Sequence, residues 1–219
     1  MSEKFTFLIL SGPTKEYIDP VRYISNESSG KMGLALASYA VKKGYKVIFI
    51  SGEVKKYPKK VELIKVTTAL DMFKASKFKL QVVDIVIIVA AVADYRPVKL
   101  QKHKIKRSGN SILLKFKKNF DIVKYCGKNK SDQVVAGFAL ETQNLLANAK
   151  LKLKNKNLDL IVANGIDSFG CDKTTVHLMR SCSDNVVKIE NRNKKFIAGK
   201  IIDETVRIFK TIKSFKKNT

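Results

Sequence analysis

Short, mostly apolar runs alternate with helix-like segments through most of this chain. Such runs are typical of strands buried on both faces of a parallel sheet, and the segments between them carry apolar residues at helical spacing. The strand-like runs are Phe5–Leu10, Val47–Ser51, Val61–Val66, Ile85–Ala90, Val134–Phe138 and Leu158–Ala163, and the helix-like segments are Met32–Lys43, Ala69–Phe78 and Leu145–Lys154. This alternation predicts an α/β fold with a doubly wound, mostly parallel, Rossmann-like sheet.

Two stretches depart from this alternation. Residues 94–120 form a lysine-rich loop followed by the strand-like run Ser111–Phe116, which predicts a flap leading into a β-hairpin. A second antiparallel pair is predicted at Thr175–Met179 and Val186–Glu190, before a final amphipathic helix from Ile197 to Phe215.

The composition is that of a globular domain. With 219 residues and 45% hydrophobic content the chain can bury a full core, so we expect a single domain over residues 1–219. No apolar stretch is long enough to span a membrane and the first residues lack an apolar signal segment, which predicts a soluble, cytoplasmic protein without a membrane partner. The 3 cysteines and 2 histidines have no ligand spacing, so no metal site is predicted.

The formal net charge of +24 invites comparison with nucleic-acid-binding proteins, because clustered cations release counterions when they bind phosphate backbones. Base readout relies on bidentate arginine, however, and most of the cations here are lysines spread along helix faces and the C-terminal tail. We therefore expect no nucleic-acid partner. The positive charge should instead steer small anionic substrates towards a cleft.

The stretch Asp19–Gly33 has the composition of an anion-binding loop that opens a helix. Backbone N–H groups of residues 28–31 would point, together with the helix dipole, towards a phosphate. Gly30 and Gly33 allow a positive φ and a close approach, and Asn26 adds a side-chain amide at the same mouth. The alternative is a capped helix N-terminus with nothing bound. The stretch is not a P-loop, since methionine follows the Gly-Lys pair, and no G-x-G-x-x-G fingerprint follows the first strand directly.

Ligands of open α/β sheets bind beyond the carboxyl ends of the strands, so residues at these ends are candidates. Asp94 could accept a hydrogen bond from a ribose hydroxyl, and Phe138 could stack on a base. Lys104, Lys152 and Lys156 could neutralise phosphates. Each also has a structural alternative, with the aspartate as a cap, the phenylalanine in the core and the lysines on solvated faces. Their shared position at one edge of the sheet favours a ligand site.

Five motifs follow one another between residues 11 and 178. They are Asp19-Pro-Val-Arg-Tyr-Ile-Ser-Asn-Glu-Ser-Ser-Gly-Lys-Met-Gly33, Ala90-Ala-Val-Ala-Asp-Tyr-Arg-Pro97, Lys104-Ile-Lys-Arg107, Gly137-Phe-Ala-Leu-Glu-Thr142 and Leu158-Asp-Leu-Ile-Val-Ala-Asn164. In this order they resemble the phosphopantothenate–cysteine ligases, also called phosphopantothenoylcysteine synthetases, of the bacterial kind usually fused to a flavin-dependent decarboxylase. The resemblance does not extend to the decarboxylase, which implies a stand-alone ligase or one domain of a larger protein.

The resemblance implies a ligation in two half-reactions in coenzyme A biosynthesis. The carboxylate of 4′-phosphopantothenate would attack the α-phosphorus of a nucleoside triphosphate, and the amine of L-cysteine would then displace the nucleotide from the acyl-nucleotide. Bacterial members use CTP and the animal enzymes use ATP. We therefore predict CTP, an acyl-cytidylate intermediate and Mg²⁺ bound with the triphosphate, and keep ATP as the alternative. The family also implies a homodimer with the active site near the interface.

Matched residue by residue, the resemblance assigns two catalytic roles. Asn26 would contact the acyl-nucleotide and stabilise charge at its carbonyl, and Lys104, on a flexible flap, would serve the second half-reaction. The nucleotide-contacting positions would be Gly12, Ser29, Gly30, Met32, Ala90, Ala91, Asp94, Asn119, Asp121, Ile122, Phe138, Lys152 and Lys156. Two residues depart from the family: Phe120 replaces the proline of a common Asn-Pro-Asp-Ile segment, and Arg107 stands where a second flap lysine is usual.

Two other classes of protein remain as alternatives. A short-chain Rossmann oxidoreductase would need a Tyr-x-x-x-Lys pair at its active site, but the candidate Tyr39-Ala-Val-Lys42 lies on the first predicted helix. Glu53 stands where such a fold places its ribose-binding acid, although it is an isolated carboxylate. A nucleic-acid-binding module would instead show salt-sensitive binding of a polyanion that excludes CTP.

Overall fold

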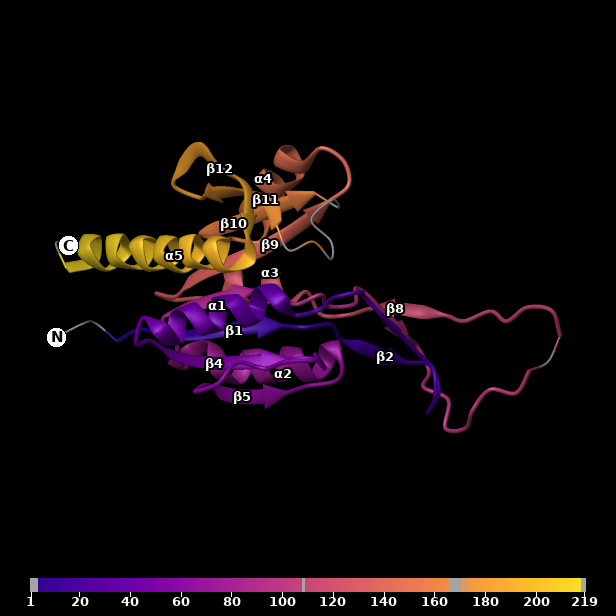
Figure 1. Cartoon of the computed structure of the whole chain (residues 1–219). Coiled ribbons are helices and arrows are strands. Elements are labelled where there is room, and N and C mark those ends of the chain that lie inside the picture. Colours follow the sequence, from indigo (N-terminus) through magenta and orange to yellow (C-terminus); the bar gives the residue numbers. More distant parts are fainter. Residues whose placement is uncertain (1–3, 108, 166–170, 172, 218–219) are drawn as a thin grey trace.

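The computed structural model describes residues 4–107, 109–165, 171 and 173–217. Its centre is an eight-stranded sheet with the strand order β12-β11-β10-β9-β6-β1-β4-β5 (Figure 1). The strands are β1 (Thr6–Ser11), β4 (Lys46–Ser51), β5 (Glu62–Lys65), β6 (Ile85–Ile88), β9 (Val134–Glu141), β10 (Leu160–Gly165), β11 (Lys173–Arg180) and β12 (Ser183–Asn193).

The topology confirms the predicted fold class. Every neighbouring pair from β5 to β10 is parallel, and β11 and β12 extend the sheet as antiparallel strands. The chain begins at the centre with β1, adds β4 and β5 on one side, and then crosses over to add β6, β9 and β10 on the other. This crossing leaves a crevice beyond the carboxyl ends of β1 and β6, where open α/β sheets bind their ligands.

Helices cover both faces of the sheet. They are α1 (Lys31–Lys42), α2 (Ala69–Lys79), α3 (Ile122–Asn129), α4 (Leu145–Asn155) and α5 (Lys194–Lys217), with a short 3₁₀ turn at Leu80–Val82. In β1, Phe7 and Ile9 face α1 and α5. The alternate residues Leu8 and Leu10 face α2, α3 and α4. All four side chains are fully buried, and burial of each contributes about 1.5–3 kcal/mol, which is why continuous apolar runs form the central strands.

Two small antiparallel ladders lie at the carboxyl edge of the sheet, among the described residues (Figure 1). The first pairs β2 (Lys15–Tyr17) with β3 (Tyr23–Ser25), and the second pairs β7 (Tyr95–Pro97) with β8 (Phe116–Lys118). Residues 98–107 and 109–115, which lie between β7 and β8, are called the flap below. Figure 1 shows β2, β8 and the flap extending away from the main sheet.

The flap hairpin corrects one predicted strand. Of the predicted run Ser111–Phe116 only Phe116 lies in a strand, because the ladder lies further along the chain and ends where Asn119 N donates to Asp94 O at 2.8 Å. The apolar run that suggested the strand is exposed instead, with Leu113 at 88% of its full accessibility. Ser108, which precedes this run, lies outside the described residues.

Other predicted elements are confirmed, and two were missed. The β11–β12 pair and the final helix α5 are present, and Gly44 follows α1 with a φ of 83°, as a C-terminal glycine should. The β2–β3 hairpin and α3 were not predicted. Strand β9 runs on to Glu141, so Phe138 lies within the strand and not after it. No helix in the described part of the chain is long and apolar enough to cross a membrane.

Candidate functional site

A cleft of about 680 Å³ lies at the carboxyl edge of the sheet, beside the crossing between β1 and β6. Its walls come from the segment that leads into α1, from the loop after β6 and from the ends of β9 and β10. Of the predicted site residues, the cleft brings together Asn26, Ser29, Gly30, Met32, Ala90, Ala91, Asp94 and Phe138. Residues from distant parts of the sequence therefore share one cavity.

The start of α1 forms one wall of the cleft, and its geometry depends on two glycines. Gly30 is the N-cap residue, with a φ of 67° and no side-chain cap. At Gly33 an added Cβ would stand 2.0 Å from Ser11 Oγ, so glycine is required for α1 to approach β1 this closely. The N–H groups of a helix's first turn have no partner within the helix, so they and the helix dipole favour an anion in the cleft.

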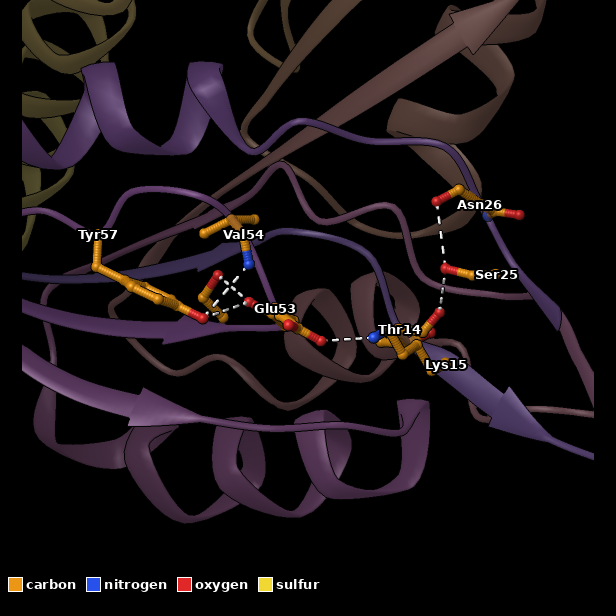
Figure 2. A network of polar contacts seen from close by, with 9 residues as sticks. Thr14, Lys15, Ser25, Asn26, Glu53, Val54 and Tyr57 are labelled. Atoms are coloured by element: carbon orange, nitrogen blue, oxygen red, sulfur yellow. Dashed lines mark hydrogen bonds and ion pairs between the residues drawn. The ribbon is translucent and has the colours of Figure 1, made fainter. Parts of the chain in front are cut away.

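Asn26 is held at the cleft by polar contacts from two segments. Its Nδ2 donates to Val92 O at 3.0 Å. Figure 2 shows the neighbouring Ser25 between Thr14 and Asn26, where Ser25 Oγ donates to Thr14 O at 2.8 Å. The buried Thr14 Oγ1 accepts from Ala93 N at 3.0 Å. The network couples the β2–β3 hairpin to the loop after β6 and fixes the Asn26 amide between them.

A second hollow of about 450 Å³ adjoins the cleft and shares Ala90, Asp94 and Phe138 with it. It brings together four further predicted contacts, namely Asn119, Asp121, Ile122 and Lys156. Asn119 is fixed to the loop after β6, because its Nδ2 donates to Ala93 O at 2.8 Å while its backbone N–H donates to Asp94. The loop after β6 therefore lines both the cleft and this hollow.

An aromatic stack supports the turn that carries Asn119. Phe120, where the resemblance leads us to expect a proline, stacks on Phe73 of α2 with ring centroids 4.5 Å apart and planes 12° apart. The Arg96 guanidinium lies 5.8 Å from the centroid of the Phe120 ring, and its Nη1 donates to Asn119 Oδ1 at 2.5 Å. Packing against α2 therefore holds this turn, in place of the restricted φ of a proline.

Two of the predicted phosphate-binding lysines already have carboxylate partners. Lys156 Nζ pairs with Asp121 at 3.0 Å, and Lys152 Nζ pairs with Glu141 at 2.5 Å. Burial opposes ionisation of Glu141, but hydrogen bonds from Lys152 and Asn148 hold its pKa below the usual value. Lys156 lines the second hollow, whereas Lys152 lines neither cavity within the described residues. Phosphate binding by either lysine stays a prediction.

Lys104 lies apart from the cleft, in the flap. There it lines a separate hollow of about 810 Å³ with Arg22, Ile105, Lys106 and Arg107. Its side chain is exposed, and within the described ranges its ammonium has no hydrogen-bond or ion-pair partner. The structure does not bring Lys104 into contact with Asn26, so their joint action stays a prediction.

Gly12 is also predicted to contact the nucleotide, but among the described residues it lines neither the cleft nor the second hollow. It has a φ of 72°, and an added Cβ would stand 2.9 Å from Ser51 Oγ. Its carbonyl accepts from Ala91 N at 2.9 Å. Gly12 thus makes the turn that carries the chain from β1 towards the cleft, and a nucleotide contact stays a prediction.

Part of the cleft wall was missed from the sequence. Thr174 and Val176 on β11, and Lys194 at the start of α5, line the cleft. No local pattern marks these residues, since they reach the cleft only when β11 folds back beside β10 as an antiparallel strand. Only the tertiary structure shows that these residues line the cleft.

The residues that a short-chain oxidoreductase would need serve other purposes. Tyr39 OH donates to Asp203 Oδ2 at 3.0 Å, which links α1 to α5. Glu53 forms an exposed ion pair with Lys15 at 2.5 Å (Figure 2). Within the described ranges, no group of three or more His, Cys, Asp or Glu side chains could hold a metal ion.

The fold and the site define a doubly wound α/β protein with an anion-favouring cleft at the topological switch point of its sheet. Comparison with known proteins identifies the family. The model of the DNA/pantothenate metabolism flavoprotein C-terminal domain matches residues 2–208, and the chain belongs to this family. The family membership expected from the motifs is confirmed.

Two of the relatives are bacterial proteins named for coenzyme A biosynthesis. The chain is 46% identical over 175 residues to the coenzyme A biosynthesis bifunctional protein CoaBC of Bacillus subtilis (strain 168), an alignment that covers 77% of this chain and 43% of the relative. It is 40% identical over 208 residues to CoaBC of Escherichia coli (strain K12), covering 91% of this chain and 51% of the relative. The chain therefore spans about half the length of these relatives.

Several solved structures match over nearly the whole chain, and one of them shares more than a third of its residues with it. This one is the crystal structure of the C-terminal domain of the coenzyme A biosynthesis bifunctional protein CoaBC, with 36% identity and a TM-score of 0.80. The match covers 96% of each chain. The described fold is therefore that of a C-terminal CoaBC domain.

Proposed function

We propose that this chain is a phosphopantothenate–cysteine ligase, which joins 4′-phosphopantothenate to L-cysteine in coenzyme A biosynthesis. The observation that carries the proposal is the cleft, where Asn26, the start of α1 and the loop after β6 converge. Further support comes from the names of the relatives and from their coverage of this chain.

In the first half-reaction, the carboxylate of 4′-phosphopantothenate attacks the α-phosphorus of CTP. An O–P bond forms, pyrophosphate leaves, and the product is an acyl-cytidylate, a mixed anhydride with a good leaving group. The protein's contribution is positioning and stabilisation of charge on the phosphoryl oxygens. The N–H groups at the start of α1, beside Ser29 and Gly30, are suited to hold a phosphate there.

In the second half-reaction, the amine of L-cysteine attacks the acyl carbonyl. The amide bond forms, the C–O bond to the nucleotide breaks, CMP leaves and the amine gives up a proton. Asn26 Nδ2 has one N–H that makes no bond within the described residues, and it would donate to the carbonyl oxygen as negative charge develops. The Lys104 ammonium, which has no partner in the described part of the chain, would act in this step by neutralising charge on the departing phosphate.

The nucleotide is proposed to be CTP. The Asn26–Gly33 and Lys104–Arg107 stretches resemble the bacterial members of the ligase family. Asp94 and Phe138 line both the cleft and the second hollow, and in this proposal they would meet the ribose and the base. Mg²⁺ is proposed to arrive with the triphosphate, and because the described residues hold no carboxylate cluster we assign it no protein ligand and no step.

One assay tests the proposal. The protein is incubated with 4′-phosphopantothenate, L-cysteine, Mg²⁺ and either CTP or ATP, and pyrophosphate and nucleotide monophosphate are followed. We expect CMP release that depends on both acceptor substrates and is much faster than AMP release. AMP release at an equal or higher rate would overturn the choice of CTP. If neither CTP nor ATP gave any nucleotide monophosphate, the proposed ligase activity would be wrong.

We further propose that the protein is a cytoplasmic homodimer. The β2–β3 hairpin exposes the apolar side chains Val21, Tyr23 and Ile24, and a second copy would remove such a patch from water. Light scattering after size exclusion should give twice the chain mass of 24.6 kDa. A monomer mass would contradict the dimer.

A further inference from the structure

Asp19, in the turn between β2 and β3, has a fully buried carboxylate. Its Oδ1 accepts from Val21 N and Arg22 N, each at 2.9 Å, which closes the turn. Its Oδ2 accepts from Arg22 Nε at 2.9 Å, from Arg22 Nη2 at 2.5 Å and from Ile105 N at 3.1 Å. The Arg22 guanidinium outweighs burial and, with the backbone N–H donors, holds the pKa of Asp19 well below its usual value.

The bond to Ile105 joins this turn to the flap. Both peptide groups of Ile105 are engaged, because its carbonyl accepts from Arg22 Nη2 at 2.8 Å while its N–H donates to Asp19. A second attachment lies at Gln101, whose N–H donates to Ile18 O at 3.0 Å. The segment between the two attachments contains Lys104, directly before Ile105 in the chain.

Burial within this chain contributes little to holding the flap in place. Of its described side chains, only Gln101, Ile105 and Leu114 are half-buried, and the others are exposed. Hydrogen bonds that involve a charged group are stronger than those between neutral groups, so the bond that Asp19 accepts and the bond that Arg22 donates dominate the local position of the backbone. Because the Lys104 ammonium has no partner within the described ranges, its direction depends on that backbone.

We infer that Asp19 and Arg22 form an anchor that holds the flap at Ile105 and so determines where Lys104 is presented. Asp19 is then a positioning residue, which acts through Ile105 and touches no substrate. The kinetic consequence of the anchor rests on the proposed ligase function. The existence of the anchor does not rest on that function, and it can be tested without substrate.

The two oxygens of Asp19 have separate tasks, which permits a selective variant. In Asp19→Asn, the amide can keep Oδ1 as the acceptor of the turn N–H groups and place an NH₂ group where Oδ2 stood. An NH₂ group cannot accept a hydrogen bond from Arg22 or Ile105. The turn should therefore remain closed while the bond from Ile105 N to Asp19 is lost and Arg22, which donates to Ile105 O, loses the carboxylate that holds its guanidinium.

Limited trypsin digestion reports on the anchor. Cuts after Lys106 and Arg107, located by mass spectrometry, should form about tenfold faster in Asp19→Asn than in the wild type, because a segment must leave its anchored position to enter a protease. In the ligase assay, steady-state CMP release by this variant should fall about tenfold. A single turnover should still release about one equivalent of pyrophosphate, since the cleft around Asn26 is unchanged.

A second variant removes the same bond from the other side. Ile105→Pro deletes the N–H that Asp19 accepts and leaves the hairpin untouched, so it should also speed the cuts after Lys106 and Arg107. Leu113→Pro is the matched control, because the Leu113 N–H makes no bond within the described residues. This control should keep wild-type cutting and wild-type CMP release.

The outcomes separate the anchor from the function. Equal cutting rates in the wild type and Ile105→Pro would overturn the anchor, even if Asp19→Asn failed to fold by circular dichroism. Faster cutting with unchanged CMP release would overturn the positioning of Lys104. If the wild type released no CMP, the proposed function would fail, and the cutting rates would still decide the anchor.

Discussion

The amide of Asn26 shows what a single residue contributes at this site. Its Nδ2 donates to Val92 O at 3.0 Å and retains a second N–H for a ligand. Replacing it in Asn26→Ala should lower steady-state CMP release about 10²–10³-fold, the usual cost of losing one donor to a developing oxyanion. The fold should be retained, because the side chain is exposed, and circular dichroism checks this.

Asn129 provides the control for Asn26. Its Nδ2 also donates to a carbonyl, that of Tyr125 at 2.8 Å, but on the outer end of α3. Asn129→Ala should therefore keep wild-type turnover. If Asn26→Ala kept it as well, Asn26 would be only a structural link between the β2–β3 hairpin and the loop after β6.

Lys104 is the second residue with a separable role. If it serves the second half-reaction, Lys104→Gln should still release about one equivalent of pyrophosphate per active site, without steady release of CMP, and the acyl-cytidylate should be recoverable by mass spectrometry. Lys102→Gln, in the same flap, is the matched control and should behave as wild type. A Lys104→Gln protein that forms neither pyrophosphate nor intermediate would place Lys104 in nucleotide binding or the first step.

At the scale of elements, the sequence was most informative where burial is continuous. The central strands β1 and β6 follow from the runs Phe5–Leu10 and Ile85–Ala90, because strands covered on both faces need apolar side chains at every position. Helix α5 was equally clear from its apolar periodicity. The residues within such elements are sufficient to predict them.

Elements held by single contacts were not predictable in the same way. Helix α3 is short and contains Gly127, and it depends on Asp121, whose side chain accepts from Lys124 N at 2.9 Å. The β2–β3 ladder is only three residues long on each side and closes through the buried Asp19 carboxylate. Such short stretches, each closed by one local side-chain contact, cannot be told from loops by their sequence pattern.

The stack of Phe120 on Phe73 gives a prediction at this scale, since it joins the turn before α3 to α2. Phe120→Ala should lower the free energy of unfolding by about 1 kcal/mol, the worth of such an aromatic pair, as measured in urea. It should also weaken CTP binding several-fold in calorimetry, because Asn119 and Arg96 lose their support.

Phe78→Ala is the control for this stack. Phe78 lies on the same helix but is 79% exposed, so its loss should change neither stability nor CTP binding. Unchanged CTP binding in Phe120→Ala would limit the stack to a structural role. The replacement of the family's proline would then have no bearing on the nucleotide.

At the scale of the whole molecule, the candidate site depends on how distant segments meet. Motif matching found Asn26, Asp94 and Phe138 because each lies in a recognisable stretch, and the sheet topology then brings them to one cleft. It could not find Thr174 or Lys194, which reach the cleft only through the antiparallel extension of the sheet. The sheet topology therefore identifies site residues that motif matching misses.

The net charge of +24 is a property of the whole molecule, and it arises because carboxylates are few relative to lysines and arginines. Asp19 and Glu141 have folded-state pKa values below their usual ones, Asp19 through Arg22 and Glu141 through hydrogen bonds that overcome burial. The unfolded chain therefore binds more protons than the folded one between each folded pKa and the unfolded values of about 3.9 for Asp and 4.3 for Glu. The stability these groups contribute is present above that range and is lost as the pH falls through it.

His177 on β11 adds a second pH-dependent loss of stability, which begins at a higher pH. Burial, followed by repulsion from Lys188, lowers its pKa below the ordinary value of 6.5. Since a half-buried neutral histidine must take up a proton at a cost, stability should begin to fall as the pH drops below about 6.5. This step and the carboxylate step should be separable, because they occupy different pH ranges.

Urea unfolding at a series of pH values and constant ionic strength tests both steps. We expect the free energy of unfolding to decrease slightly below about pH 6.5 and steeply below about pH 4, where loss of carboxylate charge also increases the self-repulsion of an already cationic chain. His177→Gln should remove the first step and Asp19→Asn should reduce the second, because each variant deletes the titrating group. A wild-type profile that stays flat from about pH 7 to about pH 3 would mean that these groups have the same proton affinity in the folded and unfolded chains.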